Sequence, residues 1–295
     1  MVKVKISERQ LNLLREYSKK AGSFIFEGVE DDEDDFDPFG YGAEEDEEDP
    51  KMKGVTNSCI LGFNKIGNAK LKHPYFSLPA GYSCPGAKNC ITKADRTTGK
   101  LTDKPTTQFR CYAASQETRP NVRNARWKNF DLLREAKTKD AMYKLISDSI
   151  NFHFETSLTL LRIHESGDFF NQAYFDAWLN IAKDRPETIF YAYTKAIPYW
   201  VARLNDIPKN FKLTASKGGH YDSLIEKYNL KHVEVVFTPE DAKAKRLYID
   251  KDDSLAWKQD KSFAILLHGI QPANTPASDA MKNLRKRGLN NFGKN

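Results

Sequence analysis

The sequence contains little cysteine and no long apolar run. Only 4 of its 295 residues are cysteine, and none of them forms the C-x2-C pair with which zinc fingers and ribbons supply two thiolates from one turn. No apolar run approaches the roughly 18 residues of a membrane-spanning helix, and no charged-then-apolar leader is visible. We therefore expect a cytoplasmic protein without membrane contact, whose thiols stay reduced rather than forming disulfides.

Basic residues are absent from the stretch Glu27 to Asp49, which carries 14 acidic side chains. A block of like charge that also contains Gly and Pro buries too little apolar surface to offset the entropy cost of ordering, so we predict a disordered insert at residues 27–50. The other residues hold 46 basic and 26 acidic side chains, a balance of +20. This balance favours nucleic acid as a partner.

Residues 1–26 are predicted to form an N-terminal helical arm. Ser7 stands three residues before Gln10 as a capping box, and Gly22 ends the helical pattern. Either this arm or the acidic insert could bind a partner protein. We assign residues 51–295 to one α/β domain that contains a cysteine loop, residues 84–111.

Apolar segments typical of strands alternate with helical segments in the second half of the chain. One such helix is predicted from Asn171, a suitable N-cap, to Pro186, with Tyr174 and Trp178 at helical spacing. The alternation predicts a parallel sheet of six β/α units, either a partial (β/α)6 barrel or a closely related parallel sheet. The predicted strands are residues 75–80, 158–165, 188–195, 211–216, 233–239 and 262–269.

Polar residues follow these strands at the ends where such sheets carry their chemistry. His164 could act in catalysis or simply form hydrogen bonds within its strand. Asp168 could bind an amine or a metal, or cap the following helix. Lys195 could be catalytic or solvated. The candidate catalytic residues are His164, Glu165, Asp168, Lys195 and His268, and the candidate cofactor-binding residues are Ser166, Gly167, Asp168 and Ser216.

The cysteines are spaced too widely for a common zinc module. Gaps of 24, 5 and 20 residues separate Cys59, Cys84, Cys90 and Cys111. An iron–sulfur cluster tolerates wide spacing because its ligands reach different irons. We predict one metal site formed by Cys84, Cys90 and Cys111, in which Cys59 is either a further ligand or a buried thiol, and zinc is the alternative metal.

A basic segment follows the last of these cysteines. Arg119, Arg123 and Arg126 recur at helical spacing, and Lys128 lies close by. We predict that these four residues contact the phosphate backbone of a nucleic acid. The alternative is a solvated surface stripe.

Three motifs carry a resemblance to a known family. "CPGAKNC", "CYA" and "RIHESGDFFNQAYFDAWLNIAKDRPETIFYAYTKA" resemble the gene product 88 family, whose members are encoded mainly by bacteriophages and prophages. The resemblance covers about residues 60–290. It implies that the protein is made in the cytoplasm of an infected bacterial host.

A more distant similarity links "CYA" and "YTK" to phage radical-SAM proteins of the gene product 37/68 type. This resemblance implies a barrel of radical-SAM type, a four-iron cluster held by Cys84, Cys90 and Cys111, and S-adenosylmethionine whose methionyl amine is held by Asp168 or Glu165. Lys195 matches a lysine of the third strand. The chain departs from that pattern because it lacks the C-x3-C-x2-C spacing and carries 20 residues between Cys90 and Cys111.

Three functions remain open at this stage. The first is an iron–sulfur enzyme acting on nucleic acid or nucleotides. The second is a nucleic-acid-binding protein with a structural metal, in which His164, Asp168 and His268 only form hydrogen bonds. The third is a metal-dependent nuclease that uses Glu165, Asp168 and Lys195.

Overall fold

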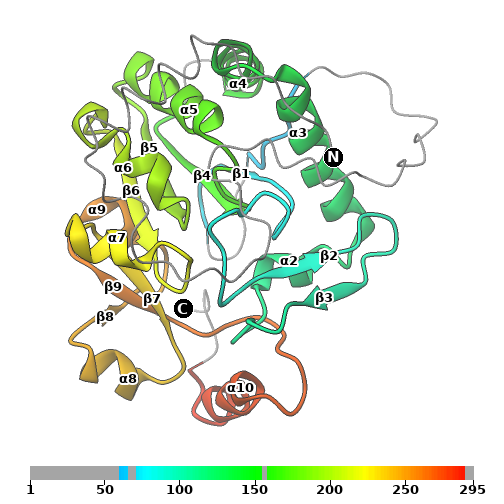
Figure 1. The fold of residues 1–295 in the computed structure, drawn as a ribbon, viewed down its shortest axis with the longest axis vertical. Coiled ribbons are helices and arrows are strands. Elements are labelled where there is room, and N and C mark those ends of the chain that lie inside the picture. Colours follow the sequence, from blue (N-terminus) through cyan, green and yellow to red (C-terminus); the bar gives the residue numbers. More distant parts are fainter. Residues whose placement is uncertain (1–59, 66–70, 155–157, 290–295) are drawn as a thin grey trace, which may run out of the picture. The chain divides into compact units, whose positions relative to one another are not determined.

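A computed structural model describes residues 60–65, 71–154 and 158–289 (Figure 1). All of these residues belong to the unit Pro50–Asn295. The predicted N-terminal arm, the predicted acidic insert and Cys59 lie outside the described residues. Within the described ranges, no helix is both long and apolar enough to cross a membrane.

A seven-stranded sheet forms the centre of this unit, with the strand order β1-β4-β5-β6-β7-β9-β8. All pairings in this sheet are parallel, so the predicted parallel sheet is confirmed. The sheet is open, and β1 and β8 are its two ends among the described residues. The strands are β1 (Tyr75–Ser77), β4 (Leu160–Ser166), β5 (Ile189–Thr194), β6 (Phe211–Ser216), β7 (His232–Val236), β8 (Tyr248–Ile249) and β9 (Phe263–Leu266).

Helices connect consecutive strands, as the alternating sequence pattern predicted. In Figure 1, α3, α4 and α5 lie beside β1, β4 and β5, whereas α8 and α10 lie towards β7, β8 and β9. The helices are α2 (Tyr112–Gln116), α3 (Pro120–Ala136), α4 (Lys139–Phe154), α5 (Gln172–Asp184), α6 (Ile197–Val201), α7 (Asp222–Lys227), α8 (Pro239–Ala244), α9 (Ser254–Lys258) and α10 (Pro276–Lys286), with a short 3-10 helix, η1 (Leu204–Asp206).

The start of α5 agrees with the sequence prediction. The Asn171 side chain accepts a hydrogen bond from the Tyr174 backbone N–H at 2.8 Å, as an N-cap does. Upstream of β4 the chain forms two successive helices, α3 and α4. Lys137 has a φ of +56° between them, a left-handed conformation that interrupts a helix.

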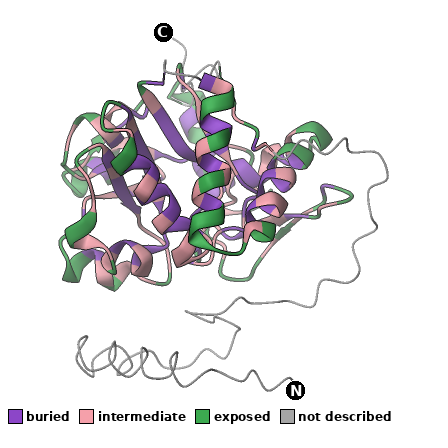
Figure 2. Ribbon diagram, turned by 90° about the horizontal axis from the view of Figure 1, so that it is seen from above, coloured by how far each residue is buried: buried purple, intermediate pink, exposed green. Residues whose placement is uncertain are grey.

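Two apolar layers cover the sheet. On one face, Ile163, Phe190 and Leu213 pack against helix residues that include Trp178. On the other face, Tyr191, Val233 and Phe263 surround Ala256 of α9. Figure 2 shows the buried residues concentrated on the strands and on the inward sides of the helices. Because both faces are covered, polar groups of this domain can meet a ligand mainly at the ends of the strands.

The pairing of β1 with β4 contains an irregularity near the polar end of β4. Tyr75 pairs with Arg162, and Ser77 pairs with Ser166, so β4 has two more residues over this interval than β1. Such bulges redirect side chains and often lie next to functional sites. Here the bulge spans the His-Glu segment that the sequence suggested as part of the site.

The first part of the cysteine loop is followed by a separate antiparallel hairpin, which the sequence pattern did not predict. It consists of β2 (Thr92–Ala94) and β3 (Leu101–Asp103). Gly99 adopts a φ of +73° in its turn, a conformation that glycine adopts at little cost. The 20 residues between Cys90 and Cys111 are therefore an ordered hairpin that returns the chain to the sheet.

Candidate metal centre at the carboxyl edge of the sheet

The cysteine loop lies across the carboxyl ends of β5 and β6, which belong to the carboxyl edge of the sheet. Asn89 N–H donates to the Gly218 carbonyl at 2.9 Å, and His220 N–H donates to the Gly86 carbonyl at 3.1 Å. A Cβ atom at Gly86 would collide with the backbone carbonyl of Lys195. The loop backbone is therefore fixed directly on the strand ends.

The thiols of Cys84, Cys90 and Cys111 lie close enough to influence one another. Burial raises the pKa of Cys84 well above its usual value, and the charges of Asp168, Cys111 and Cys90 raise it further. Burial also raises the pKa of Cys111 to about 12, with Cys90 the strongest charge acting on it. Residues up to 27 positions apart in the sequence are thus gathered at one place.

Backbone N–H groups point at two of these sulfurs. Gly81 N–H donates to Cys84 Sγ at 3.4 Å. Cys111 is the N-cap of α2, and the nearby backbone N–H groups of Ala114 and Ala113 lower the pKa of its thiol. Donors of this kind stabilise thiolates and tune metal–thiolate centres.

The thiols are side chains of the kind that a thiophilic metal binds. Within the described ranges, no three Cys, His, Asp or Glu side chains are grouped closely enough to hold a metal ion. Coordination would therefore require the thiols to come closer together. The participation of Cys59 stays a prediction, because that residue lies outside the described ranges.

Asp168 joins the carboxyl ends of β4 and β5. Its Oδ1 accepts hydrogen bonds from Thr194 Oγ1 at 2.6 Å and from Phe169 N–H at 2.7 Å, and its Oδ2 accepts from Lys195 N–H at 2.7 Å. Burial raises the pKa of Asp168 to about 6, although these hydrogen bonds lower it. Both oxygens are engaged within the protein, so a catalytic or cofactor-binding role for Asp168 stays a prediction.

Lys195 makes the next connection, from β5 to β6. Its Nζ donates to the Ser216 carbonyl at 2.9 Å, to Ser216 Oγ at 2.7 Å and to the Lys217 carbonyl at 2.8 Å. The side chain is buried, so the solvated alternative is wrong. Ser216 Oγ accepts a hydrogen bond from this ammonium group. Lys195 and Ser216 therefore form a structural link at the place predicted for catalysis and cofactor binding.

Glu165 belongs to a buried network of three charges. Arg126 donates to Glu165 Oε2 at 2.9 Å and to Glu117 Oε1 at 2.8 Å, and all three side chains are at most 5% exposed. Burial raises the pKa of Glu117, while Arg126 opposes that rise. The network ties α2, which begins next to Cys111, to α3 and β4.

Comparison with known proteins identifies the family. The model of the family described as "Gene product 88" matches residues 45–286. The chain belongs to the gene product 88 family. It is 31% identical over 150 residues to the "Gene 88 protein" of Mycobacterium phage L5 and 30% identical over 149 residues to the "Gene 88 protein" of Mycobacterium phage D29. Each alignment covers 48% of this chain and 55% of the relative, so the chain spans about half the length of these curated relatives. No solved structure matches.

In this member of the gene product 88 family, the predicted nucleic-acid-binding stripe is not on the surface. Arg123 and Arg126 are 4% and 3% exposed. The Arg123 guanidinium donates to three backbone carbonyls, among them that of Glu117 at 2.6 Å. Arg119 is exposed and Lys128 is partly exposed. The expectation of a solvent-facing stripe is therefore wrong for Arg123 and Arg126, because their helical face packs against the cysteine loop and α2.

The two candidate histidines have different surroundings. His164 is buried, its Nε2 lies 3.1 Å from Tyr174 Oη, and its ring packs against Phe169. Burial lowers its pKa to about 3, so it is neutral at pH 7. The ring turns towards α5 and makes a hydrogen bond there, which was the alternative to catalysis, and a catalytic role for His164 stays a prediction. His268 stays at the edge, with its ring 4.6 Å from that of Tyr112.

Gly167 and Ser166 occupy crowded positions. Gly167 has a φ of +85°, and a Cβ there would lie 2.5 Å from Ser83 Oγ. Glycine is needed both for this backbone conformation and for the close approach of the chain next to Cys84. Ser166 is buried, and its hydroxyl lowers the pKa of Glu117. Their predicted roles in cofactor binding stay untested.

Sequence reasoning missed a second buried ion pair, on the α9 side of the sheet. Arg162 of β4 binds Asp253, which stands just before α9, and both side chains are buried. Tyr112 Oη donates to the Glu165 carbonyl at 2.6 Å and lies 3.5 Å from an Arg162 nitrogen. The only sequence signal for Tyr112 is that it directly follows Cys111, which could have suggested that Tyr112 lies near the strand ends.

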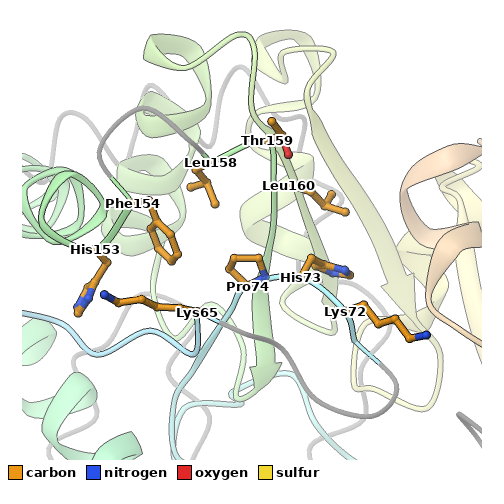
Figure 3. Close-up of a pocket in the computed structure, with 9 residues that line it drawn as sticks. All are labelled: Lys65, Lys72, His73, Pro74, His153, Phe154, Leu158, Thr159 and Leu160. Atoms are coloured by element: carbon orange, nitrogen blue, oxygen red, sulfur yellow. The ribbon is translucent and has the colours of Figure 1, made fainter.

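The cavities found in the structure lie at the opposite, amino edge. One, of about 430 Å³, is lined by Lys65, Lys72, His73, His153 and other residues at the amino ends of β1 and β4 (Figure 3). Figure 3 shows the Lys65 and Lys72 side chains extending in opposite directions. A second, of about 270 Å³, adjoins the start of β6. Neither cavity includes a candidate residue from the sequence analysis.

Proposed function

We propose that this gene product 88 protein is an iron–sulfur enzyme whose cluster is held by Cys84, Cys90 and Cys111 at the carboxyl edge of the sheet. The observation that carries the proposal is the position of these three partly buried thiols over the ends of parallel strands, within electrostatic reach of one another. Parallel β/α sheets place their chemistry at this edge.

The residues around the thiols suit this role. Gly81 N–H and the N–H groups at the start of α2 would donate hydrogen bonds to ligand sulfurs, which shifts the reduction potential of such centres. A bound cluster supplies one-electron chemistry that side chains do not provide. The links made by Asp168 and Lys195 hold the strand ends and the loop in a fixed arrangement around the ligands.

The order of the strands supports a finer proposal. From β1 to β7 each strand lies next to the strand that precedes it in this sheet, and only β8 departs from this order because it lies outside β9. A β/α barrel has such a sequential order, whereas a doubly wound sheet reverses direction at a switch point. We propose that the sheet is a partial (β/α)6 barrel. Together with the distant resemblance to radical-SAM phage proteins, this makes S-adenosylmethionine the cofactor to test first.

The nuclease alternative gains no support from the geometry. Glu165 is paired with Arg126, and Asp168 accepts three hydrogen bonds from its neighbours. The two carboxylates therefore belong to separate networks, whereas a nuclease would use them together on a metal. A structural zinc bound by the same cysteines is the alternative that the chemical test has to distinguish.

The test is anaerobic purification and cluster reconstitution, followed by iron, sulfide and zinc analysis. We expect brown protein with bound iron and sulfide, and a large loss of both in Cys84→Ser, Cys90→Ser and Cys111→Ser, because the remaining thiolates hold a cluster poorly. Cys59→Ser is the matched control. Retained iron in that variant indicates a three-thiolate site, and lost iron adds Cys59 as a ligand.

Two results would overturn the proposal. Colourless protein with stoichiometric zinc would assign the cysteines to a structural metal site. Unchanged metal content in all four single variants would show that the thiols are structural. Binding of S-adenosylmethionine is measured separately by calorimetry on reconstituted protein, so that a negative result there rejects this cofactor alone.

A further inference from the structure

Three backbone segments meet at the outer rim of the carboxyl edge. Ala87 of the cysteine loop pairs with Gly219 through an isolated antiparallel β-bridge, and Lys88 and His220 flank this bridge at its two ends. The third segment follows β3, where Lys104 N–H donates to the Ile91 carbonyl at 3.5 Å. We call Lys88, Lys104 and His220 the cationic rim.

The side chains of the cationic rim are exposed. Among the described residues, no carboxylate forms an ion pair with Lys88 or Lys104. Burial and the charge of Lys88 lower the pKa of His220, and Lys104 adds to this effect, so both ammonium groups act on one imidazole. Three basic side chains from three segments therefore face a shared patch of solvent.

The nearest carboxylates are engaged elsewhere. Asp222 accepts hydrogen bonds from Gly218 N–H at 2.8 Å and Gly219 N–H at 3.0 Å, and Asp103 is paired with Arg110. Asp222 raises the pKa of His220, although other effects outweigh it. The charges of Lys88 and Lys104 are thus left for an external anion, and Lys88 stands two residues before Cys90 in the cysteine loop.

We propose that Lys88, Lys104 and His220 form a phosphate-binding site that holds the backbone of a nucleic acid next to the cysteines. Ammonium groups bind phosphate as point charges and release its counterions. The hydrogen bonds that fix the loop on β6 also fix the spacing of the rim, so little order has to be gained on binding. This site rests on the proposed function and names its substrate class. It assigns the phosphate contact to the loop and not to the buried arginines of α3.

The test uses the full chain with Lys88 and Lys104 both changed to Ala. We expect binding of a fluorescently labelled single-stranded DNA oligonucleotide to weaken roughly tenfold or more at low salt, and the slope of log affinity against log salt to fall by about 1.4, the value for two lost phosphate contacts. A Lys88→Arg/Lys104→Arg variant should retain binding, since it keeps both charges. ATP is titrated in parallel to separate free nucleotides from a polymer.

Lys209 and Lys261 provide the matched control. Both are exposed, both lie just before strands at the amino edge, and their replacement by Ala removes the same charge. Equal weakening in the rim variant and this control would overturn the site, because the loss would reflect net charge alone. Weakening confined to the rim variant supports it, and the ligand that weakens, oligonucleotide or ATP, identifies the source of the phosphate. Neither result depends on iron, so the rim and the cluster can fail separately.

Discussion

The two edges of the sheet differ in how their space is used. At the amino edge, cavities of about 430 and 270 Å³ open among lysine, histidine and apolar side chains. At the carboxyl edge, the cysteine loop packs onto the strand ends, and buried polar side chains fill the junctions. The thiols and the buried carboxylates stand at this second edge.

The contrast shows that these cavities and the chemically reactive side chains lie at different edges of the sheet. A well-formed cavity is the usual first hypothesis for a binding site, but the cavity of about 430 Å³ lies at the end of the sheet where β/α proteins owe conserved features to stability rather than to catalysis. At the carboxyl edge, any substrate has to approach over an outer surface, because the interior is occupied by side chains that bind one another.

Arg126 gives the largest expected effect at the carboxyl edge. Replacing Arg126 by Met leaves Glu117 and Glu165 buried without their partner, which typically costs about 3–5 kcal/mol. Arg119→Met, at an exposed position of the same segment, should change the free energy of unfolding by less than about 0.5 kcal/mol. Urea denaturation of both variants measures the difference. Equal stabilities would contradict the buried network and restore Arg126 as a surface residue.

Gly86 tests whether the loop is fixed on the strand ends. Gly86→Ala should lower the free energy of unfolding by roughly 2–4 kcal/mol, because the added methyl group meets the Lys195 backbone and cannot be relieved by a side-chain rotation. Gly62→Ala is the control, since its Cβ makes only an ordinary contact of 3.6 Å. Similar denaturation midpoints for both variants would mean that the loop is not docked as described.

Asp168 gives the smallest effect, and one that depends on pH. Its pKa of about 6 in the folded protein exceeds the ordinary value of about 4. Between these values the folded state binds a proton that the unfolded state has lost, so the contribution of Asp168 to stability falls as pH rises through this window, by at most about 3 kcal/mol. The Asp168→Asn variant has no carboxyl group to titrate at this position. The free energy of unfolding of the variant, relative to that of the original protein, should therefore rise as the pH increases through this window. A constant difference would contradict the raised pKa.

The sheet was predictable because its strands are encoded locally. Each of the six predicted strands is a largely apolar segment, and each overlaps a strand of the structure. β8 has only two residues, which is too short for a pattern to be visible. The sequence did not decide between a partial barrel and a closely related parallel sheet, since the curvature of a sheet depends on contacts between strands that are far apart in sequence.

The candidate site was predictable in its location but not in its pairings. Polar residues after apolar strands indicated the correct edge, whereas the contact between Arg126 and Glu165 joins residues 39 positions apart. The burial of Arg126 did leave a local signal. Phe130 and Leu133 follow it at i+4 and i+7 and are buried, so Arg126 belongs to the apolar face of α3.

β8 is the last strand of the sheet, beyond β9, and this position affects whether two copies of the protein can pair through their sheet edges. An exposed strand offers unpaired backbone groups to which another chain can add. Here the last strand of the sheet is only Tyr248–Ile249, and the exposed cations Arg246 and Lys251 flank it. Two residues between like charges give a second copy almost no template for pairing. The strand that departs from the sequential order of the sheet therefore also protects the protein from edge-to-edge aggregation.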